Sequence, residues 1–214
     1  MIRNMVVPFA DTLSGARSNR NLQELNMSFH HVSKSLLIPF AMLLVSMCQA
    51  VPQENDGPFH KGSVIPDFGN VATVESDVEI PSGTVLKVRF DVGRKARKNS
   101  INTTFDSVAR FINLNVAAGI PAENLQVAVV VHGSAALDVT KQDFYGAKNE
   151  GSSNASEKAV ETLLKHNVRF ILCGQSAAYQ EITKKDLLDG VKVAPSAMTM
   201  HALLALEGFS LNPF

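Results

Sequence analysis

Polar or reactive side chains stand at or near the ends of four apolar runs between residues 84 and 196. They are Asp91 in TVLKVRFDV, His132 in LQVAVVVHG, Cys173 in VRFILCG and Ser196 after VKVAP. Runs of this kind are typical of buried β-strands. Ligands of an open α/β sheet bind beyond the carboxyl ends of the strands. We therefore expect these four side chains to lie at the edge where chemistry could occur.

Cys173 is the residue with the most specific chemistry. Gly174 follows it, and the next residues, QSAAY, can begin a helix. The sulfur would then face free backbone N–H groups and the positive end of a helix dipole. Such surroundings can lower the pKa of a thiol from about 8.5 to roughly 3.5–7.5. Cys173 is therefore predicted to be a nucleophile, and the alternative is a buried thiol that packs as a small apolar side chain.

His132 is the predicted proton partner of Cys173, because an imidazole can pair with a thiolate or move a proton. The alternative is a histidine that only bonds to a neighbouring loop. Gln175 and Ser176 could donate hydrogen bonds to an anionic sulfur or could cap the helix. The residues predicted to bind substrate are Gly174, Gln175, Ser176, Asp91, Gly133 and Ser196.

A basic run, GRKARKN, follows Asp91 and contains Arg94, Lys95, Arg97 and Lys98. A solvated loop is one interpretation, and a loop that attracts an anion such as a sulfur oxyanion is the other. His201 lies inside an apolar helical pattern and is predicted to be a packed or surface histidine.

Several kinds of site and partner are not expected. HGSAALD lacks the spacing of a dinucleotide loop, and no P-loop lysine signature is present. The histidines are scattered and no cysteine pair is suited to zinc, so we expect no metal and no cofactor. Twenty basic residues balance twenty acidic ones, which gives no reason to expect nucleic acid as a partner.

Strand and helix patterns alternate through residues 82–214. Helical patterns are expected at 105–119, 154–167 and 196–208, with a short capped helix at 183–188, and FSLNPF forms a final strand or tail. Such alternation predicts an α/β domain with a mainly parallel sheet and helices on both faces.

The first 50 residues are predicted to be an N-terminal extension and a signal peptide. From Met27, MSFHHVSKSLLIPFAMLLVSMCQA has a basic start, an apolar run and small residues at its end, as signal peptides do. We expect cleavage after Ala50, export to the periplasm or the medium, and Met27 as a candidate initiator. The alternatives are a lipoprotein signal at Cys48 and a permanent anchor, although the run is shorter than the ~20 residues that span a bilayer.

Residues 51–81 are punctuated by proline and glycine and are predicted to form an irregular arm. Removal of the first 50 residues leaves Cys173 as the single cysteine, so no internal disulfide is expected. An unpaired cysteine in an exported protein indicates a bond between chains or a functional thiol.

The chain from about Val85 to Phe214 resembles the DsrE/DsrF-like family. The stretches that carry the resemblance are RFDV, ARFINL, VVVHGSA, LCGQSAAY and ALLALEGFSL. The resemblance implies a three-layer α/β/α fold similar to flavodoxin, with about five strands, and assembly into a homotrimer or hexamer. It also implies a cysteine that carries sulfur as a persulfide, which in this sequence would be Cys173.

Two hypotheses of function result, and the sequence leaves open whether the protein is an enzyme. In the first, Cys173 forms a persulfide, His132 moves a proton, and backbone amides after Gly174 stabilise the negative sulfur. Such a sulfur carrier or transferase would work with a donor or acceptor protein. In the second, the protein is a non-catalytic module that binds a small ligand or assembles into an oligomer, and Cys173 is structural.

Overall fold

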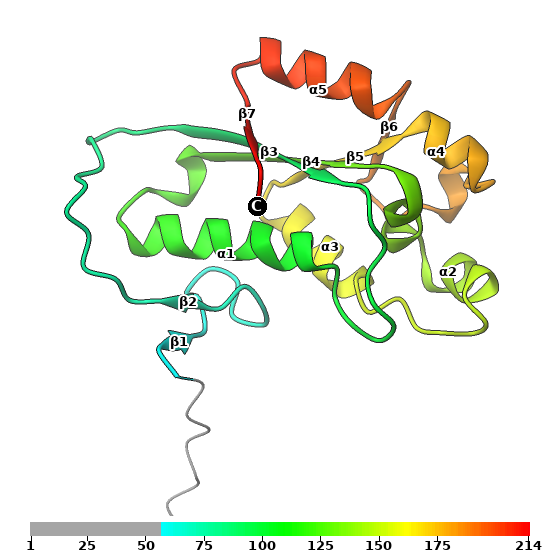
Figure 1. Cartoon of the computed structure of the whole chain (residues 1–214), viewed down its shortest axis with the longest axis horizontal. Coiled ribbons are helices and arrows are strands. Elements are labelled where there is room, and N and C mark those ends of the chain that lie inside the picture. The colour runs from blue at the N-terminus through cyan, green and yellow to red at the C-terminus, as the bar shows by residue number, and fades with distance from the viewer. Residues whose placement is uncertain (1–56) are drawn as a thin grey trace, which may run out of the picture. The chain divides into compact units, whose positions relative to one another are not determined.

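The computed structural model describes residues 57–214 (Figure 1). The predicted signal peptide, its cleavage after Ala50 and the first residues of the arm lie outside this part of the chain. Two short strands, β1 (Phe59–His60) and β2 (Val71–Ala72), pair antiparallel within the arm. Asn113 of the main domain accepts a hydrogen bond from the N–H of Ile65 at 2.9 Å, which ties the arm to the domain.

The main domain contains a five-stranded sheet in which every pair of neighbours is parallel. In order along the sheet the strands are β6 (Lys192–Ala194), β5 (Arg169–Cys173), β4 (Leu125–Val131), β3 (Leu86–Val92) and β7 (Ser210–Asn212). The last segment, FSLNPF, therefore contributes an edge strand beside β3. This observation confirms the prediction of a mainly parallel sheet with about five strands.

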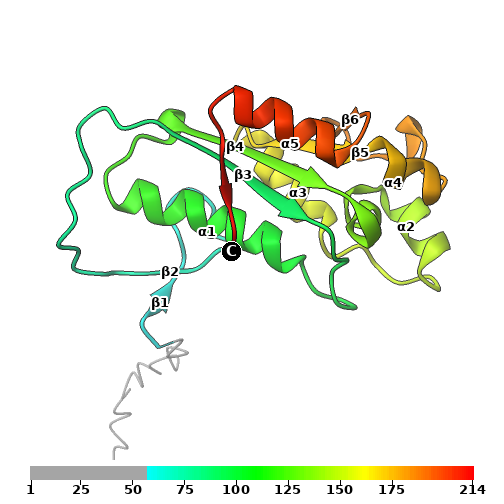
Figure 2. The ribbon, with the colours of Figure 1, turned by 45° about the horizontal axis from the view of Figure 1, so that its top comes forward.

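Helices cover both faces of the sheet, as Figures 1 and 2 show. α1 (Thr103–Ala117) and α3 (Glu157–Lys165) lie on one face, and α5 (Ala197–Leu206) lies on the other. The predicted three-layer α/β/α sandwich is confirmed. If the five strands of this sheet are numbered by their position along the chain, their order across the sheet is 4-3-2-1-5. Flavodoxin has the order 2-1-3-4-5. The fold therefore resembles flavodoxin in its three layers and differs from it in strand order.

The remaining helices lie mostly near the carboxyl edge of the sheet. They are α2 (Gln142–Lys148), α4 (Gly174–Tyr179), and the 3₁₀ turns η1 (Ala122–Asn124), η2 (Gly133–Val139) and η3 (Lys184–Asp186). The short helix predicted at 183–188 is the single turn η3. Thr183 and Asp186 form a capping box there, so the capping signal was present although the turn is shorter than predicted.

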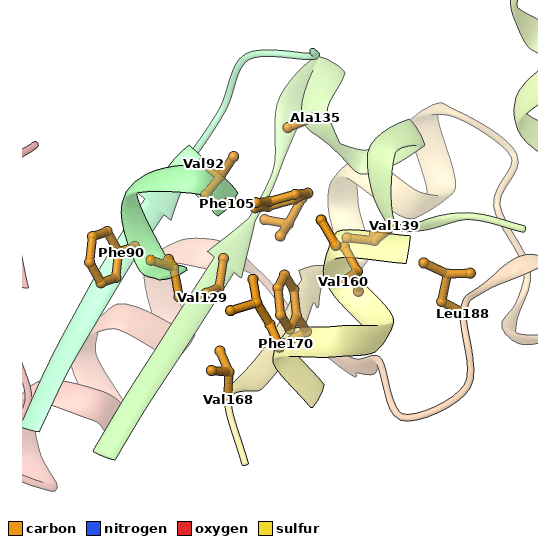
Figure 3. Close-up of a cluster of buried hydrophobic side chains, with 14 of the residues drawn as sticks. Phe90, Val92, Phe105, Val129, Ala135, Val139, Val160, Val168, Phe170 and Leu188 are labelled. Carbon is orange, nitrogen blue, oxygen red and sulfur yellow. The ribbon is translucent and has the colours of Figure 1, made fainter. Parts of the chain in front are cut away.

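The larger part of the core lies between the sheet and the layer of α1 and α3. Phe105 of α1 packs edge-to-face on Phe170 of β5, with ring centroids 5.4 Å apart (Figure 3). The last five residues of β4 are buried on both faces of the sheet, which explains its continuous apolar sequence. A smaller cluster, which includes Met200 and Leu204, fills the space under α5.

α1 shows how local sequence sets an element of this layer. Asn102 caps its first turn by accepting a hydrogen bond from the N–H of Thr104, a preferred role for asparagine. Phe105, Val108 and Ile112 are buried and lie on one face because residues three and four apart are neighbours on a helix. Among the helices of residues 57–214, none is long and apolar enough to cross a membrane.

Candidate functional site

Asp91, His132 and Cys173 lie near the carboxyl ends of the adjacent strands β3, β4 and β5, and their side chains leave the same face of the sheet. Each is next to a residue of the core under α1 and α3, namely Val92, Val131 and Leu172. Since successive strand residues point to opposite faces, all three predicted residues face α5. The N–H of His132 donates to Val92 O at 2.9 Å, so the pleat of β4 continues through His132.

Cys173 is the residue at which β5 ends and α4 begins. Burial raises the pKa of its thiol, whereas hydrogen-bonding groups of Ser176, the N–H of Ala197 and the N–H of Gln175 lower it, and the net pKa lies below the ordinary value of a thiol. These donors belong to the first turns of α4 and α5. The sulfur therefore lies between two helix N-termini, while Cys173 as a whole is only 6% exposed.

Ser176 connects Cys173 to the loop after β4. Its Oγ accepts a hydrogen bond from the N–H of Gly133 at 2.8 Å. Because that bond occupies an acceptor position, the hydroxyl hydrogen of Ser176 is free to be donated to a thiolate. Gly133 has a φ of 56°, a conformation that glycine adopts at little cost. The predicted residues Gly133 and Ser176 are thus brought together beside the sulfur.

Gly174 is required by the close approach of the neighbouring strand. A Cβ at this position would lie 2.7 Å from Ala194 O, a distance that permits no larger residue without movement of β6. Gln175 is exposed, and its side-chain amide donates to Pro195 O at 3.3 Å. Both residues therefore help to hold the β6–α5 connection next to Cys173.

Ser196 is the N-cap of α5. Its Oγ accepts a hydrogen bond from the N–H of Thr199 at 3.0 Å. The side chain that was predicted to bind substrate is thus engaged in the helix cap. Its contribution to the site is to fix the first turn of α5, which contains the Ala197 N–H.

His132 forms a hydrogen-bonded pair with Asp91 rather than with the sulfur. His132 Nε2 lies 3.0 Å from Asp91 Oδ1, and within residues 57–214 no hydrogen bond joins His132 to Cys173. Burial raises the pKa of Asp91, but the hydrogen bonds from His201 and His132 lower it more, and the net pKa lies below its ordinary value. Asp91 can therefore stabilise a protonated imidazole.

His201 of α5 is a site residue that the sequence did not reveal. Its Nε2 lies 2.8 Å from Asp91 Oδ1, so Asp91 interacts with two imidazoles. The sequence predicted a packed or surface histidine there. The available signal was a single ionisable ring in an otherwise apolar helix, AMTMHALLAL, but only the fold shows which partner it meets.

Comparison with known proteins identifies the family. The sequence model of the DsrE/DsrF-like family matches residues 92–212, a range that contains His132, Cys173 and His201 and begins one residue after Asp91. The chain belongs to the DsrE/DsrF-like family. The resemblance inferred from the sequence is confirmed, and membership supports a sulfur-related function at the level of the family.

Two solved structures are similar to this DsrE/DsrF-like chain. A protein of unknown function, MTH1491 from Methanobacterium thermoautotrophicum, has 22% identity and a TM-score of 0.42, and the match covers 59% of this chain and 97% of that chain. The ychN protein from E. coli has 17% identity and a TM-score of 0.44, with the same coverage of 59% and 97%. Among curated proteins, no relative matches the chain.

Proposed function

We propose that this DsrE/DsrF-like protein accepts a sulfur atom on Cys173 and carries it as a persulfide. The observation that supports the proposal most is the position of the sulfur between the first turns of α4 and α5, where hydrogen-bonding groups lower the thiol pKa. A thiolate is the form of cysteine that attacks sulfur. The family's sulfur-related function agrees with this chemistry.

The transfer step conserves atoms and electrons. The Cys173 thiolate attacks a terminal sulfur atom of a polysulfide and forms a new S–S bond to it. The old S–S bond of the polysulfide breaks, and the shortened polysulfide leaves with the electron pair. A thiolate of an acceptor protein then attacks the outer sulfur of the persulfide, takes up that sulfur, and regenerates the Cys173 thiolate.

His132 is proposed as the proton partner. It faces the same side of the sheet as Cys173 on the neighbouring strand, and Asp91 is positioned to stabilise its protonated form. A proton that leaves the Cys173 thiol would thus be held at this imidazole. The amide groups of α4 and α5 stabilise the negative charge that remains on the sulfur.

The low exposure of Cys173 favours a second candidate function. At 6% exposure, a thiol can act as a small apolar side chain, and the protein would then be a binding or assembly module with a structural cysteine. Under the sulfur-carrier proposal, the same burial selects small donors such as polysulfide over bulky ones. The reactivity of Cys173 toward a small sulfur donor therefore separates the two functions.

The decisive measurement is the intact mass of the full chain after incubation with polysulfide. We expect a gain equal to one or more sulfur atoms that reductant removes. The gain should persist in Cys48→Ser and vanish in Cys173→Ser. Ser176→Ala should slow the gain by roughly tenfold at neutral pH, since it removes a hydrogen bond to the thiolate, whereas Ser153→Ala in an exposed loop should not.

No sulfur gain in folded wild-type protein would rule out the carrier proposal and leave the structural thiol. The same conclusion would follow if Cys173 gained sulfur only in denaturant. Circular dichroism of Cys173→Ser and Ser176→Ala, compared with wild type, establishes that a lost gain is not a loss of folding.

We also propose that the chain associates with copies of itself through α5. Met198, Leu203 and Leu206 of this helix are 81%, 47% and 86% exposed, although the helix also buries Met200 and Leu204 against the sheet. A helix that is apolar on all sides is typical of a buried position. A second copy of the chain would bury the outer side.

Export is proposed from the sequence of residues 27–50, which lies outside the described residues. In that case the donor or acceptor of sulfur would be met in the periplasm or the medium. Detection of a mature N-terminus at Val51 after expression in a secreting host would support cleavage after Ala50.

A further inference from the structure

A cavity of about 470 Å³ lies between the loop after β3 and the start of α1. This volume is in the range of roughly 300–1,000 Å³ that is usual for small-molecule sites. β3 is also the strand at which the order along the sheet reverses, because β7 returns to its outer side. Ligands of open α/β sheets bind at such a reversal, beyond the carboxyl ends of the strands.

The lining of this cavity is strongly basic. Arg94, Lys95 and Arg97 all line it, and none of the three forms an ion pair with any residue between 57 and 214. Asp91 is the one carboxylate in the lining, and it already interacts with His132 and His201. The cavity therefore has an excess of positive charge, since Asp91 in the lining and Asp138 beside the loop, which interacts with Lys95, offset only part of it.

Hydrogen bonds to the exposed Ser134 and to the buried Asp138 and Asn102 hold the backbone of the basic loop in place. The N–H of Lys95 donates to Ser134 Oγ at 3.0 Å, and the N–H of Ala96 donates to Asp138 Oδ2 at 2.8 Å. The side chain of Asn102 donates to Arg94 O at 2.9 Å and to Asp138 Oδ2 at 2.7 Å. Three successive residues are thus fixed, which lowers the conformational entropy that a ligand would have to remove.

We propose that this cavity binds an anion with a phosphate- or sulfate-type oxyanion group. The guanidinium groups of Arg94 and Arg97 are suited to paired hydrogen bonds with such a group. The ammonium of Lys95 donates to Asn149 Oδ1, and Lys95 also lines the neighbouring cavity, so the two arginines are the main ligands of the proposed site. The first turn of α1 contributes Thr103 and Thr104 to the lining. This site does not contain Cys173, so the inference does not depend on the sulfur-carrier proposal.

The test is a calorimetric titration of the full chain with inorganic sulfate, inorganic phosphate and phenyl phosphate at constant ionic strength. We expect saturable binding of at least one of these anions. Arg94→Gln and Arg97→Gln should each weaken it at least about tenfold, because each removes charge-assisted hydrogen bonds. If phenyl phosphate binds more tightly than inorganic phosphate, the ligand of this site is a larger molecule that carries the oxyanion group. If the two bind equally, the ligand is a free anion.

Lys98→Gln is the matched control. It removes the same charge from the same loop, but the Lys98 side chain lines a different cavity, next to Lys148 and Asn149. We expect it to weaken binding by no more than roughly twofold, as for a screened charge at a distance. Binding that is absent, or that falls equally in Lys98→Gln and Arg97→Gln, would overturn the inference.

Cys173→Ser separates this inference from the proposed function. The variant should bind the anion as wild type does, even though it no longer gains sulfur. If wild-type protein binds the anion but gains no sulfur, the carrier proposal is wrong and the oxyanion site stands. Loss of anion binding in Cys173→Ser would contradict a site that is separate from the thiol.

Discussion

At the residue scale, Asp138 is a carboxyl group whose burial is energetically costly. It is fully buried, and its Oδ1 has no hydrogen-bond partner there. Burial raises its pKa from 3.8 to about 6, against the opposing effect of hydrogen bonds from Asn102 and Ala96. The carboxylate holds the basic loop in place, so a costly charge is retained next to the proposed oxyanion site.

The raised pKa of Asp138 predicts how stability changes with pH. The pKa of Asp138 is higher in the folded state than in the unfolded state. Its contribution to the free energy of unfolding is therefore fully present below about pH 4 and is lost as pH rises through about 6. A difference of about two units corresponds to ~3 kcal/mol. Relative to wild type, Asp138→Asn should gain stability by about this amount between pH 4 and pH 7.

Urea denaturation of both proteins at pH 4, 5, 6 and 7 measures this change. Asp77→Asn, which alters an exposed carboxylate in the arm, should track wild type at every pH. A difference between Asp138→Asn and wild type that is constant with pH would show that Asp138 has the same pKa in both states.

At the element scale, the first turn of α5 links helix stability to thiol chemistry. Ser196 caps the helix through the N–H of Thr199, and the N–H of Ala197 in the same turn lowers the pKa of the Cys173 thiol. Fraying of this turn would weaken both interactions. α5 is therefore expected to control the reactivity of a cysteine that lies on another element.

Ser196→Ala tests this link. Loss of the cap should lower the free energy of unfolding by about 1 kcal/mol and should shift the pH–rate profile of Cys173 with a small thiol reagent to higher pH. Ser82→Ala, in the exposed turn before β3, is the control for both measurements. A stability loss without any shift in the profile would show that the Ala197 N–H does not act on the sulfur.

At the scale of the whole molecule, the outer side of α5 exposes apolar side chains that a second copy of the chain could bury. Leu206 is 86% exposed, and its burial against a second copy would remove apolar surface from water. The same helix supplies Ala197 and His201 to the site on its inner side. Association through α5 would therefore place sites of neighbouring copies near their shared interface.

Light scattering at micromolar concentration tests the proposed association. We expect an oligomer for wild type and at least about tenfold weaker association for Leu206→Lys, since a buried unpaired charge is strongly unfavourable. Leu114→Lys introduces the same charge on α1, in the opposite layer, at a residue that is 43% exposed, and should leave the oligomer intact. A wild-type protein that is only monomeric would refute the proposal.

The layers of the fold and the strand ends of the candidate site are predictable from the order of residues along the chain. A continuous apolar run indicates a strand that is buried on both faces, so β4 and β5 were predictable. Cys173 was predicted at the end of a strand, and it is the last residue of β5. The helical pattern expected at 105–119 matches α1 (Thr103–Ala117) to within two residues at each end. These features depend on neighbours along the chain, which the sequence displays directly.

Contacts between groups that are distant in sequence are visible only in the folded chain. His201 and Asp91 are 110 residues apart in sequence, and the N–H of Ala197 reaches Cys173 only because α5 folds back over the sheet. The pairing of β7 with β3, and the cavity beside the basic loop, likewise arise from the order of strands across the sheet. Local patterns encode which side chains are buried and where elements end, but contacts between elements follow from how the whole chain packs.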